Sequence, residues 1–317
     1  MRNRLKNLRL TLVSIFLSLA ILILGFEAVE NIKYAQWRKE FTAYGWLNKM
    51  TVPSRDPLMM WEYRPYGVAG DIKVNRYGFR DFDYPNREKP GNVYRIAFAG
   101  DSIILGLGVK FDEMFVRQFE MKANRHRRGP VIQALDFGID GYNAIQVSEM
   151  IRTRVIPFSP DRIVYVMCLN DFDLTESAGS KPRYFQKPKS FFFERLDRLR
   201  RQMTDIPYDL FYYRKNKKLI FRTILEMSTM VRRENMDFEV LIVPVFFRRS
   251  ADFREYPLRQ IHKEVDCFLR SQGIRFYDLL ETFEAQPQGP RYWSLDPYHP
   301  NPAGHALIAE RLASEEK

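Results

Sequence analysis

The segment DRIVYVMCLND, residues 161–171, is the clearest indication of the fold. Its apolar run, Ile163 to Leu169, is followed at once by the polar pair Asn170 and Asp171. A strand that is apolar on both faces is typical of a parallel sheet covered by helices on both sides. The segment therefore predicts a buried central strand whose carboxyl end carries polar side chains.

The chain on either side of this segment alternates between strand and helix patterns. Short apolar runs that stop at glycine or at polar residues predict strands, and stretches with helical spacing separate them. This alternation predicts an α/β fold with a parallel sheet between two layers of helices. Strands are expected over 94–100, 131–138, 238–247 and 274–280, and helices over 111–126, 143–156, 256–273 and 301–316.

Polar or glycine residues follow three of these strands. Asp101 and Ser102 come after the first, Gly138 and Gly141 close the second, and Asn170 follows the third. Each has an ordinary structural explanation, because such residues also cap helices and form turns. In a parallel sheet, however, ligands bind at the carboxyl ends of the strands, so these residues are expected to lie near one another.

The segment DPYH, residues 296–299, supplies the chemistry that these strand ends lack. A serine hydroxyl becomes a good nucleophile when a base removes its proton, and His299 can be that base for Ser102. Asp296 can hold the imidazole in the required tautomer and stabilise its cation. The backbone N–H groups of Ser102 and Gly138 and the side-chain amide of Asn170 can stabilise an oxyanion.

Four blocks of the sequence resemble, in order and spacing, those of the SGNH/GDSL hydrolase superfamily. They are GDS (100–102), the glycine of DFGIDGYN (136–143), LND (169–171) and DPYH (296–299). The resemblance runs from about residue 93 to 315, within a predicted catalytic domain at 93–317, and implies a flavodoxin-like three-layer α/β/α sandwich. It also implies the roles given above for Ser102, Gly138, Asn170, Asp296 and His299.

Two positions depart from the pattern of the superfamily, and one further segment resembles its membrane-anchored bacterial members. Cys168 stands where many members have glycine, and Asp136 stands where many have asparagine; neither change removes a group that the mechanism needs. The segment VNRYGFRD, residues 74–81, resembles a stretch found ahead of the core in anchored members.

We expect no metal and no cofactor, since the chain has only two cysteines and no CxxC motif.

The N-terminus has the features of a single-pass membrane anchor. Residues 10–26 carry no charge and would span about 25 Å as a helix, and basic residues in the tail 1–9 place that end in the cytoplasm. We therefore expect a transmembrane anchor at 10–29, a cytoplasmic membrane location, and a catalytic domain that is periplasmic or extracellular. A cleaved signal peptide is the alternative, although no small-x-small site follows the apolar run closely.

Two regions remain open to more than one interpretation. Residues 30–92 form a stalk and an N-terminal extension, whose first aromatic rings suit either a membrane interface or a helix packed on the domain. Residues 172–235 form a helical insertion, which could be a lid over the site or a docking surface for the membrane or a partner. The rings of the stalk are Tyr34, Trp37, Phe41, Tyr44 and Trp46.

The composition limits the classes of partner. The hydrophobic content of 45% supports a substantial core, and the formal net charge of +11 favours anionic surroundings such as lipid headgroups or acidic glycans. Nucleic acid is not expected, because no nucleic-acid-binding motif occurs.

These features together predict a membrane-anchored serine esterase that acts on O-acyl esters, with acetyl esters first, of a cell-surface glycan or lipid. The same triad could instead transfer the acyl group to a sugar hydroxyl, as in O-acyltransferases that work with a multi-pass membrane partner. A non-catalytic assembly module is the third alternative. Loss of a catalytic residue would mark such a module, and none is lost here.

Overall fold

A five-stranded parallel sheet forms the centre of the molecule. The structure, a computed structural model, describes residues 2–44, 50–176, 183–184, 187–202, 208–247 and 250–316. All neighbouring strands of the sheet are parallel, in the order β11-β10-β7-β5-β6, which is the flavodoxin-like arrangement. The strands are β5 (Val93–Gly100), β6 (Val131–Gly138), β7 (Arg162–Cys168), β10 (Asp237–Val243) and β11 (Arg275–Asp278). Every strand expected from the sequence is present, and the predicted fold class is confirmed.

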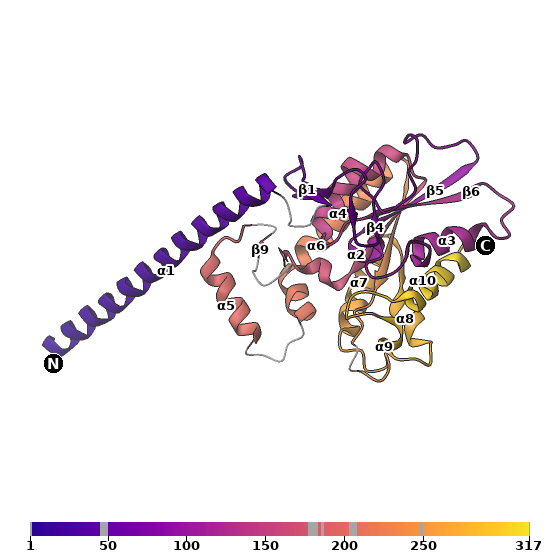
Figure 1. Ribbon diagram of the computed structural model, residues 1–317. Coiled ribbons are helices and arrows are strands. Elements are labelled where there is room, and N and C mark those ends of the chain that lie inside the picture. The colour runs from indigo at the N-terminus through magenta and orange to yellow at the C-terminus, as the bar shows by residue number, and fades with distance from the viewer. Residues whose placement is uncertain are drawn as a thin grey trace.

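Helices cover both faces of the sheet and complete the three layers (Figure 1). α3 and α10 pack together on one side, whereas α4, α6 and α7 lie next to one another on the other. α4 continues through a π-helical turn (Ile151–Val155). The helices of the domain are α2 (Ser102–Leu105), α3 (Phe115–Asn124), α4 (Ala144–Met150), α6 (Tyr208–Arg233), α7 (Arg259–Ser271), α8 (Leu279–Glu284), α9 (Pro290–Trp293) and α10 (Pro302–Ser314).

The central strand β7 is buried because it has a neighbour on each edge and a helix layer on each face. Its residues Ile163 to Cys168 are each at most 2% exposed, and they line up with β5 on one side and β10 on the other. The order of the strands reverses between β5 and β7, and a crevice forms at the carboxyl ends of two such strands. Ser102 follows β5 and Asn170 follows β7, so both stand at this crevice.

The N-terminal segment is one continuous helix, α1 (Arg2–Tyr44), which projects from the domain (Figure 1). Its stretch Arg9–Gln36 is long and apolar enough to cross a membrane, and none of its most apolar window is buried against the protein. The helix continues past the predicted end of the anchor at residue 29, so anchor and stalk are not separate elements. The crossing itself and its orientation stay predictions.

Of the aromatic rings expected in the stalk, only that of Tyr34 is described. It lies 5.9 Å, between ring centroids, from Phe191 of α5 (Phe191–Gln202). The side chains of Trp37, Phe41 and Tyr44, and residue Trp46 altogether, lie outside the described part of the chain.

Residues 50–81 pack on the domain, and several of their side chains belong to its core. Two small antiparallel pairs occur here, β1 (Thr51–Pro53) with β2 (Trp61–Tyr63), and β3 (Val68–Ala69) with β4 (Ile72–Lys73). The ring of Trp61 is buried against Tyr142, at 5.3 Å between centroids. The N-terminal extension therefore contacts the loop that follows β6, while a domain boundary at residue 93 stays a prediction.

Arg80 links this extension to the short helix α2. Its side chain is 1% exposed and donates hydrogen bonds to the carbonyls of Leu105 (3.0 Å), Gly106 (2.7 Å) and Val109 (2.9 Å). These carbonyls lie at the C-terminal end of α2 and just beyond it, where a helix leaves its own acceptors unpaired. Arg80, in the segment VNRYGFRD, thereby fixes the helix that begins with Ser102.

Replacing Arg80 with methionine should lower the free energy of unfolding by about 3 kcal/mol or more, because three buried carbonyls lose their donor at about 1–3 kcal/mol each. The thermal unfolding midpoint of the detergent-solubilised chain measures this loss. Arg76→Met is the matched control: Arg76 pairs with Asp83 at the surface, at 3.0 Å, and such exposed pairs contribute about 0–1 kcal/mol. Equal midpoints for the two variants would contradict the role of Arg80.

The insertion at 172–235 has two separate parts. α6 is the long helix between β7 and β10 and packs on the sheet as an ordinary crossover. The part before it includes the strand pair β8 (Thr175–Glu176) and β9 (Arg183–Tyr184), and α5, which contacts α1. The insertion contains the helices α5 and α6, as its predicted helical character requires. Residues 177–182, 185–186 and 203–207 lie outside the described part, and a lid or a docking surface stays a prediction.

Candidate active site

Three side chains expected to act together form one hydrogen-bonded row at the crevice. Ser102 Oγ lies 2.8 Å from His299 Nε2, and His299 Nδ1 lies 2.7 Å from Asp296 Oδ2. Ser102 is the first residue of α2, whereas His299 and Asp296 come from the loop before α10. This is the geometry in which an imidazole can take a proton from a serine while a carboxylate holds the ring.

The loop that carries His299 is held by its own backbone and by Asp296. Asp296 Oδ1 accepts hydrogen bonds from the N–H groups of Tyr298 (2.8 Å) and His299 (2.9 Å), and the N–H of Leu295 donates to the carbonyl of His299 (2.8 Å). Partial burial raises the pKa of Asp296, but the hydrogen bonds from His299 and the two amides outweigh it and hold the pKa below its usual value. Asp296 is therefore an anion with one oxygen committed to the loop and the other to His299.

Asp101 and Asn170 brace the turn on which Ser102 stands. Asp101 Oδ1 accepts a hydrogen bond from the N–H of Ile103 (3.0 Å) and so caps α2, while Oδ2 accepts one from Asn170 Nδ2 (3.0 Å). Burial raises the pKa of Asp101, whose side chain lies in the protein interior. The amide of Asn170 is thus fixed at the carboxyl end of β7, beside the strand end that carries Ser102.

The prediction that Gly138 supplies an oxyanion donor is wrong in this structure. The N–H of Gly138 donates to Asp136 Oδ1 at 3.1 Å, so it is not directed at a ligand beside Ser102. A Cβ at Gly138 would stand 2.2 Å from the backbone nitrogen of Leu105. The glycine is needed because β6 ends directly against α2, and the departure to aspartate at position 136 provides the acceptor for its amide.

Gly141, in the same loop, has the free amide that Gly138 lacks. Its φ of +76° favours glycine, and neither its N–H nor that of Ser102 has an acceptor among the residues that the structure describes. The preceding residue, Asp140, interacts electrostatically with both Asp101 and His299, which places the loop at the crevice. The sequence places Gly141 among the residues expected at the strand ends, but it predicts the oxyanion donor at Gly138 and not at Gly141.

His305 and Asp171 are structural. His305, in the first turns of α10, accepts at Nδ1 a hydrogen bond from the N–H of Phe115 at 3.1 Å, so it caps α3. Burial lowers the pKa of His305 to about 3, and the imidazole is neutral. Asp171 accepts hydrogen bonds from the hydroxyl of Tyr165 (2.6 Å) and the N–H of Cys168 (3.2 Å).

The helix α6 contacts the loop of His299 through a buried carboxyl group. The hydroxyl of Tyr298 donates to Asp209 Oδ1 at 3.2 Å, and Asp209 is 4% exposed. Burial raises the pKa of Asp209 to about 6, and the hydrogen bond from Tyr298 offsets part of that effect. The first turn of α6 therefore contacts Tyr298, the residue that precedes His299.

The folded protein holds the carboxyl proton of Asp209 more tightly than the unfolded chain does. Asp209 therefore lowers the free energy of unfolding as the pH rises from about 4 to about 6, and this loss persists above pH 6. Asp209→Asn removes the buried charge but keeps an acceptor for Tyr298. At pH 8 we expect this variant to exceed the wild type in unfolding free energy by about 1–3 kcal/mol, with the difference vanishing near pH 4. Thermal unfolding at both pH values measures it, and an advantage that is equal at the two would contradict the assignment.

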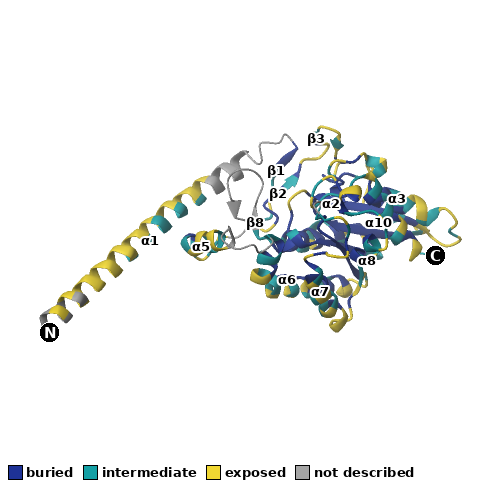
Figure 2. Cartoon of the chain, turned by 90° about the horizontal axis from the view of Figure 1, so that it is seen from below, coloured by how far each residue is buried: buried dark blue, intermediate teal, exposed yellow. Residues whose placement is uncertain are grey.

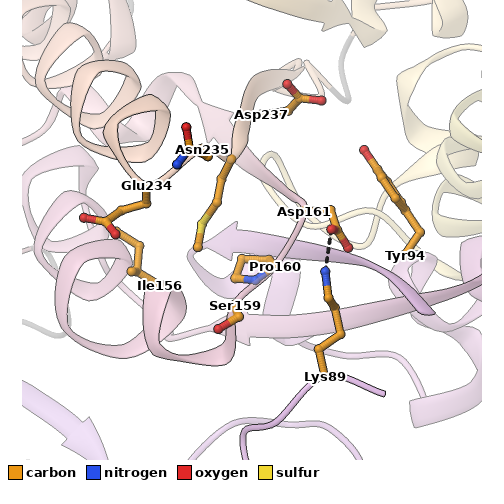
Figure 3. A pocket seen from close by; sticks show the side chains of 10 residues that line it. Lys89, Tyr94, Ile156, Ser159, Pro160, Asp161, Glu234, Asn235 and Asp237 are labelled. Carbon is orange, nitrogen blue, oxygen red and sulfur yellow. Dashed lines mark hydrogen bonds and ion pairs between the residues drawn. The ribbon is translucent and has the colours of Figure 1, made fainter. Parts of the chain in front are cut away.

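A cavity also lies at the amino ends of the strands, away from the carboxyl ends that carry Ser102 and Asn170 (Figure 3). It is lined by residues at the N-terminal ends of β7 and β10, among them Asp161 and Asp237, and Lys89 forms an ion pair with Asp161 there. Parallel sheets bind their ligands at the carboxyl ends of the strands, and the hydrogen-bonded pair Ser102 and His299 lies at those ends. We therefore place the candidate site at Ser102 and not in this cavity.

No three His, Cys, Asp or Glu side chains gather as metal ligands within the described ranges. The chemistry available at the crevice is that of a serine, an imidazole, a carboxylate and several N–H donors. This set can carry out acyl transfer through a serine ester.

Comparison with known proteins agrees with this chemistry. The model of the GDSL-like lipase/acylhydrolase family matches residues 98–307, a range that contains Ser102, Asn170, Asp296 and His299. No curated protein matches the sequence significantly.

Solved structures that resemble the chain do so at low identity. An acetyl xylan esterase is 13% identical, with 70% of this chain and 98% of that one covered and a TM-score of 0.49. An α/β hydrolase from the metagenome of Lake Arreo, Spain, is 14% identical (70% and 94% covered, TM-score 0.48). A catalytic mutant of an acetylxylan esterase from Geobacillus stearothermophilus is 15% identical (70% and 93% covered, TM-score 0.47). At such scores these likenesses carry no argument about the substrate of this chain.

Proposed function

This chain belongs to the GDSL-like lipase/acylhydrolase family and is an ester hydrolase, and we propose that Ser102, His299 and Asp296 are its catalytic triad. The observation that carries this proposal is the hydrogen-bonded row from Ser102 Oγ through both ring nitrogens of His299 to Asp296 Oδ2. The order of these atoms supports the following proposed roles. Ser102 is the nucleophile, His299 is the base, and Asp296 orients the ring.

In the first half of the proposed reaction, Ser102 Oγ attacks the ester carbonyl while His299 Nε2 takes the hydroxyl proton. The carbonyl oxygen becomes an oxyanion, and we assign its stabilisation to the N–H groups of Ser102 and Gly141 and to the side-chain amide of Asn170. Collapse of this intermediate breaks the bond to the alcohol, which leaves with the proton from His299. An acyl ester on Ser102 remains.

In the second half, water attacks the acyl ester and His299 again takes a proton. Collapse of the second oxyanion releases the carboxylic acid and returns the proton to Ser102. Asp296 stays ionised throughout, in keeping with its lowered pKa.

We further propose that α1 anchors the enzyme in the cytoplasmic membrane, with the catalytic domain in the periplasm or outside the cell. The apolar stretch of α1 and the basic residues ahead of it support this orientation. A domain held at the membrane meets envelope components, so the proposed substrates are O-acyl esters, with acetyl first, of a surface glycan or a lipid. A reporter fused after residue 317 should be active only outside the cytoplasm; activity inside would contradict the orientation.

The substrate class is tested with the full chain in vesicles, an O-acetylated polysaccharide and Ser102→Ala as the control. We expect acetate to be released by the wild type and not by the variant. Addition of an acceptor sugar separates the two outcomes of the second step. Acetyl transfer to the sugar in place of acetate release would favour the O-acyltransferase alternative, and neither product would contradict the proposed substrate class.

A further inference from the structure

Helix α5 exposes the apolar side that an amphipathic helix normally buries. Phe193 is 65% exposed, and Leu196 and Leu199 are each 43% exposed. Successive members of this set are three residues apart, so they share one broad face of the helix. We call this set the apolar face of α5. Such a surface is costly to leave in water and usually marks an interaction site.

The opposite side of α5 is charged and is held against the protein. Lys215 of α6 lies 2.7 Å from Glu194 Oε2 and 3.1 Å from Asp197 Oδ2. Phe191, at the start of the helix, is 3% exposed and packs against Tyr34 of α1. These contacts fix the rotation of α5, so the outward direction of the apolar face is a consequence of the packing.

α5 begins at the level where the uncharged part of α1 ends. Glu27 is the first charged residue after the run 10–26, and its carboxylate accepts hydrogen bonds from the N–H groups of Phe191 (3.1 Å) and Phe192 (2.9 Å) and from the hydroxyl of Ser190. Glu27 therefore caps α5. In a helix that crosses a membrane, this first charged residue stands at the boundary between hydrocarbon and headgroups.

The apolar face of α5 is continuous with the apolar surface of α1. The rings of Phe26 and Phe192 meet at 6.1 Å between centroids, and Phe192 in turn contacts Phe193. From this junction α5 runs away from α1 to the side instead of following it (Figure 1), and Figure 2 shows the two helices adjacent with exposed residues on both. A helix placed in this way can lie along a membrane surface that α1 crosses.

The charges beside the apolar face suit a lipid surface. Arg195 and Arg200 are exposed. Arginines beside an apolar face can extend to lipid phosphates while the apolar side chains enter the acyl region. The formal net charge of +11 acts in the same direction.

We propose that α5 is an interfacial helix, whose apolar face inserts into the outer leaflet of the membrane that α1 crosses and whose Arg195 and Arg200 bind lipid phosphates. The proposal rests on the anchoring of α1 proposed above. It adds a second attachment to the anchor, and because α6 joins α5 to the loop of His299, it fixes the height and the orientation of the active site above the bilayer.

The test uses the full chain, with Cys267 changed to serine, reconstituted in vesicles that contain anionic lipid. A single new cysteine at Leu196 carries an environment-sensitive fluorophore, and lipids bearing a quencher at a shallow or a deep position report its depth. We expect a blue-shifted emission, protection from aqueous iodide, and stronger quenching by the shallow lipid than by the deep one. Phe193→Cys serves as a second position on the same face.

Two control positions make failure of this proposal distinguishable from failure of the anchor. Leu17→Cys, in the middle of the run in α1, should be quenched most by the deep lipid, and Lys122→Cys on α3, far from α1 in both views, should stay open to iodide. If Leu17 lies in the bilayer but Leu196 is open to iodide, the interfacial helix is wrong and the anchor stands. If Leu17 itself is in water, both proposals fail.

A protein partner or a second copy of the chain would give a different result. Either one would protect Leu196 from iodide without any quenching by lipid. That outcome would overturn the membrane as the occupant of the apolar face.

Discussion

Replacing Ser102 with alanine should lower kcat for ester hydrolysis by at least about 10⁴-fold while leaving the fold intact. The alanine has no oxygen with which to form the acyl ester. In the proposed mechanism His299 only transfers the proton and Asp296 only orients the ring and stabilises its charge, so neither can replace the serine hydroxyl. The structural cost is small, because the hydroxyl makes one hydrogen bond, to His299, worth about 1 kcal/mol.

Turnover of a short-chain aryl ester by the detergent-solubilised chain measures the effect, with the thermal unfolding midpoint as a check on folding. Ser294→Ala is the matched control. Ser294 is also buried and makes one hydrogen bond, to the carbonyl of Pro290 at 2.9 Å, but its hydroxyl is not part of the row. Loss of turnover in both variants, or in neither, would contradict the assignment of Ser102.

Changing Asp296 to asparagine should lower kcat by about 10³–10⁴-fold, because it favours the wrong tautomer of His299. Two backbone N–H groups require an acceptor at the position of Oδ1, so the asparagine would place its oxygen there and turn its NH₂ group toward His299 Nδ1. The imidazole would then accept at Nδ1 and carry its proton on Nε2. In that state it cannot take the proton of Ser102.

Asp296→Ala separates this tautomer effect from the loss of charge. In the alanine variant water can enter the space left by the carboxylate, since the side chain of Asp296 is 47% exposed in the wild type. That water can accept the hydrogen bond from His299 Nδ1. We therefore expect alanine to be no more damaging to kcat than asparagine, although it removes more atoms. Steady-state kinetics of the two variants decide the point; an asparagine variant with near wild-type kcat would remove Asp296 from the mechanism.

The parallel sheet and most of the candidate site could be predicted from the sequence for a physical reason. A strand buried on both faces, such as β7, must be apolar almost throughout, so the polar residues at its end stand out. The proposed nucleophile and base could be predicted because serine, histidine and aspartate have complementary chemistry and occur at strand ends or in the closing loop. Those inferences need only local patterns and the topology of a parallel sheet.

The errors and omissions concern contacts that the sequence pattern does not reveal. Gly138 and Gly141 look alike in the sequence, but the N–H of Gly138 donates to Asp136 and a Cβ at this glycine would meet the backbone of Leu105, whereas the N–H of Gly141 has no acceptor among the described residues. His305 caps a helix that begins at Phe115, 190 positions earlier in the chain. Similarly, nothing in the segment VNRYGFRD indicates that Arg80 binds carbonyls around the end of α2.

The orientation of α5 is a further example. Its sequence predicts an amphipathic helix, and the ordinary expectation is that the apolar side faces the protein. The opposite orientation follows from Glu27 at its first turn and Lys215 beside its acidic residues, contacts that join three separate segments of the chain.

Covalent labelling tests the central claim most directly. The full chain is treated with a fluorophosphonate, which forms a stable adduct with an activated serine, and the modified residue is located by peptide mapping. The mechanism proposed here predicts a single adduct on Ser102 that is lost in His299→Gln, together with loss of ester turnover as the adduct forms. An adduct on a different residue, or full turnover by a chain that is completely labelled at Ser102, would contradict it.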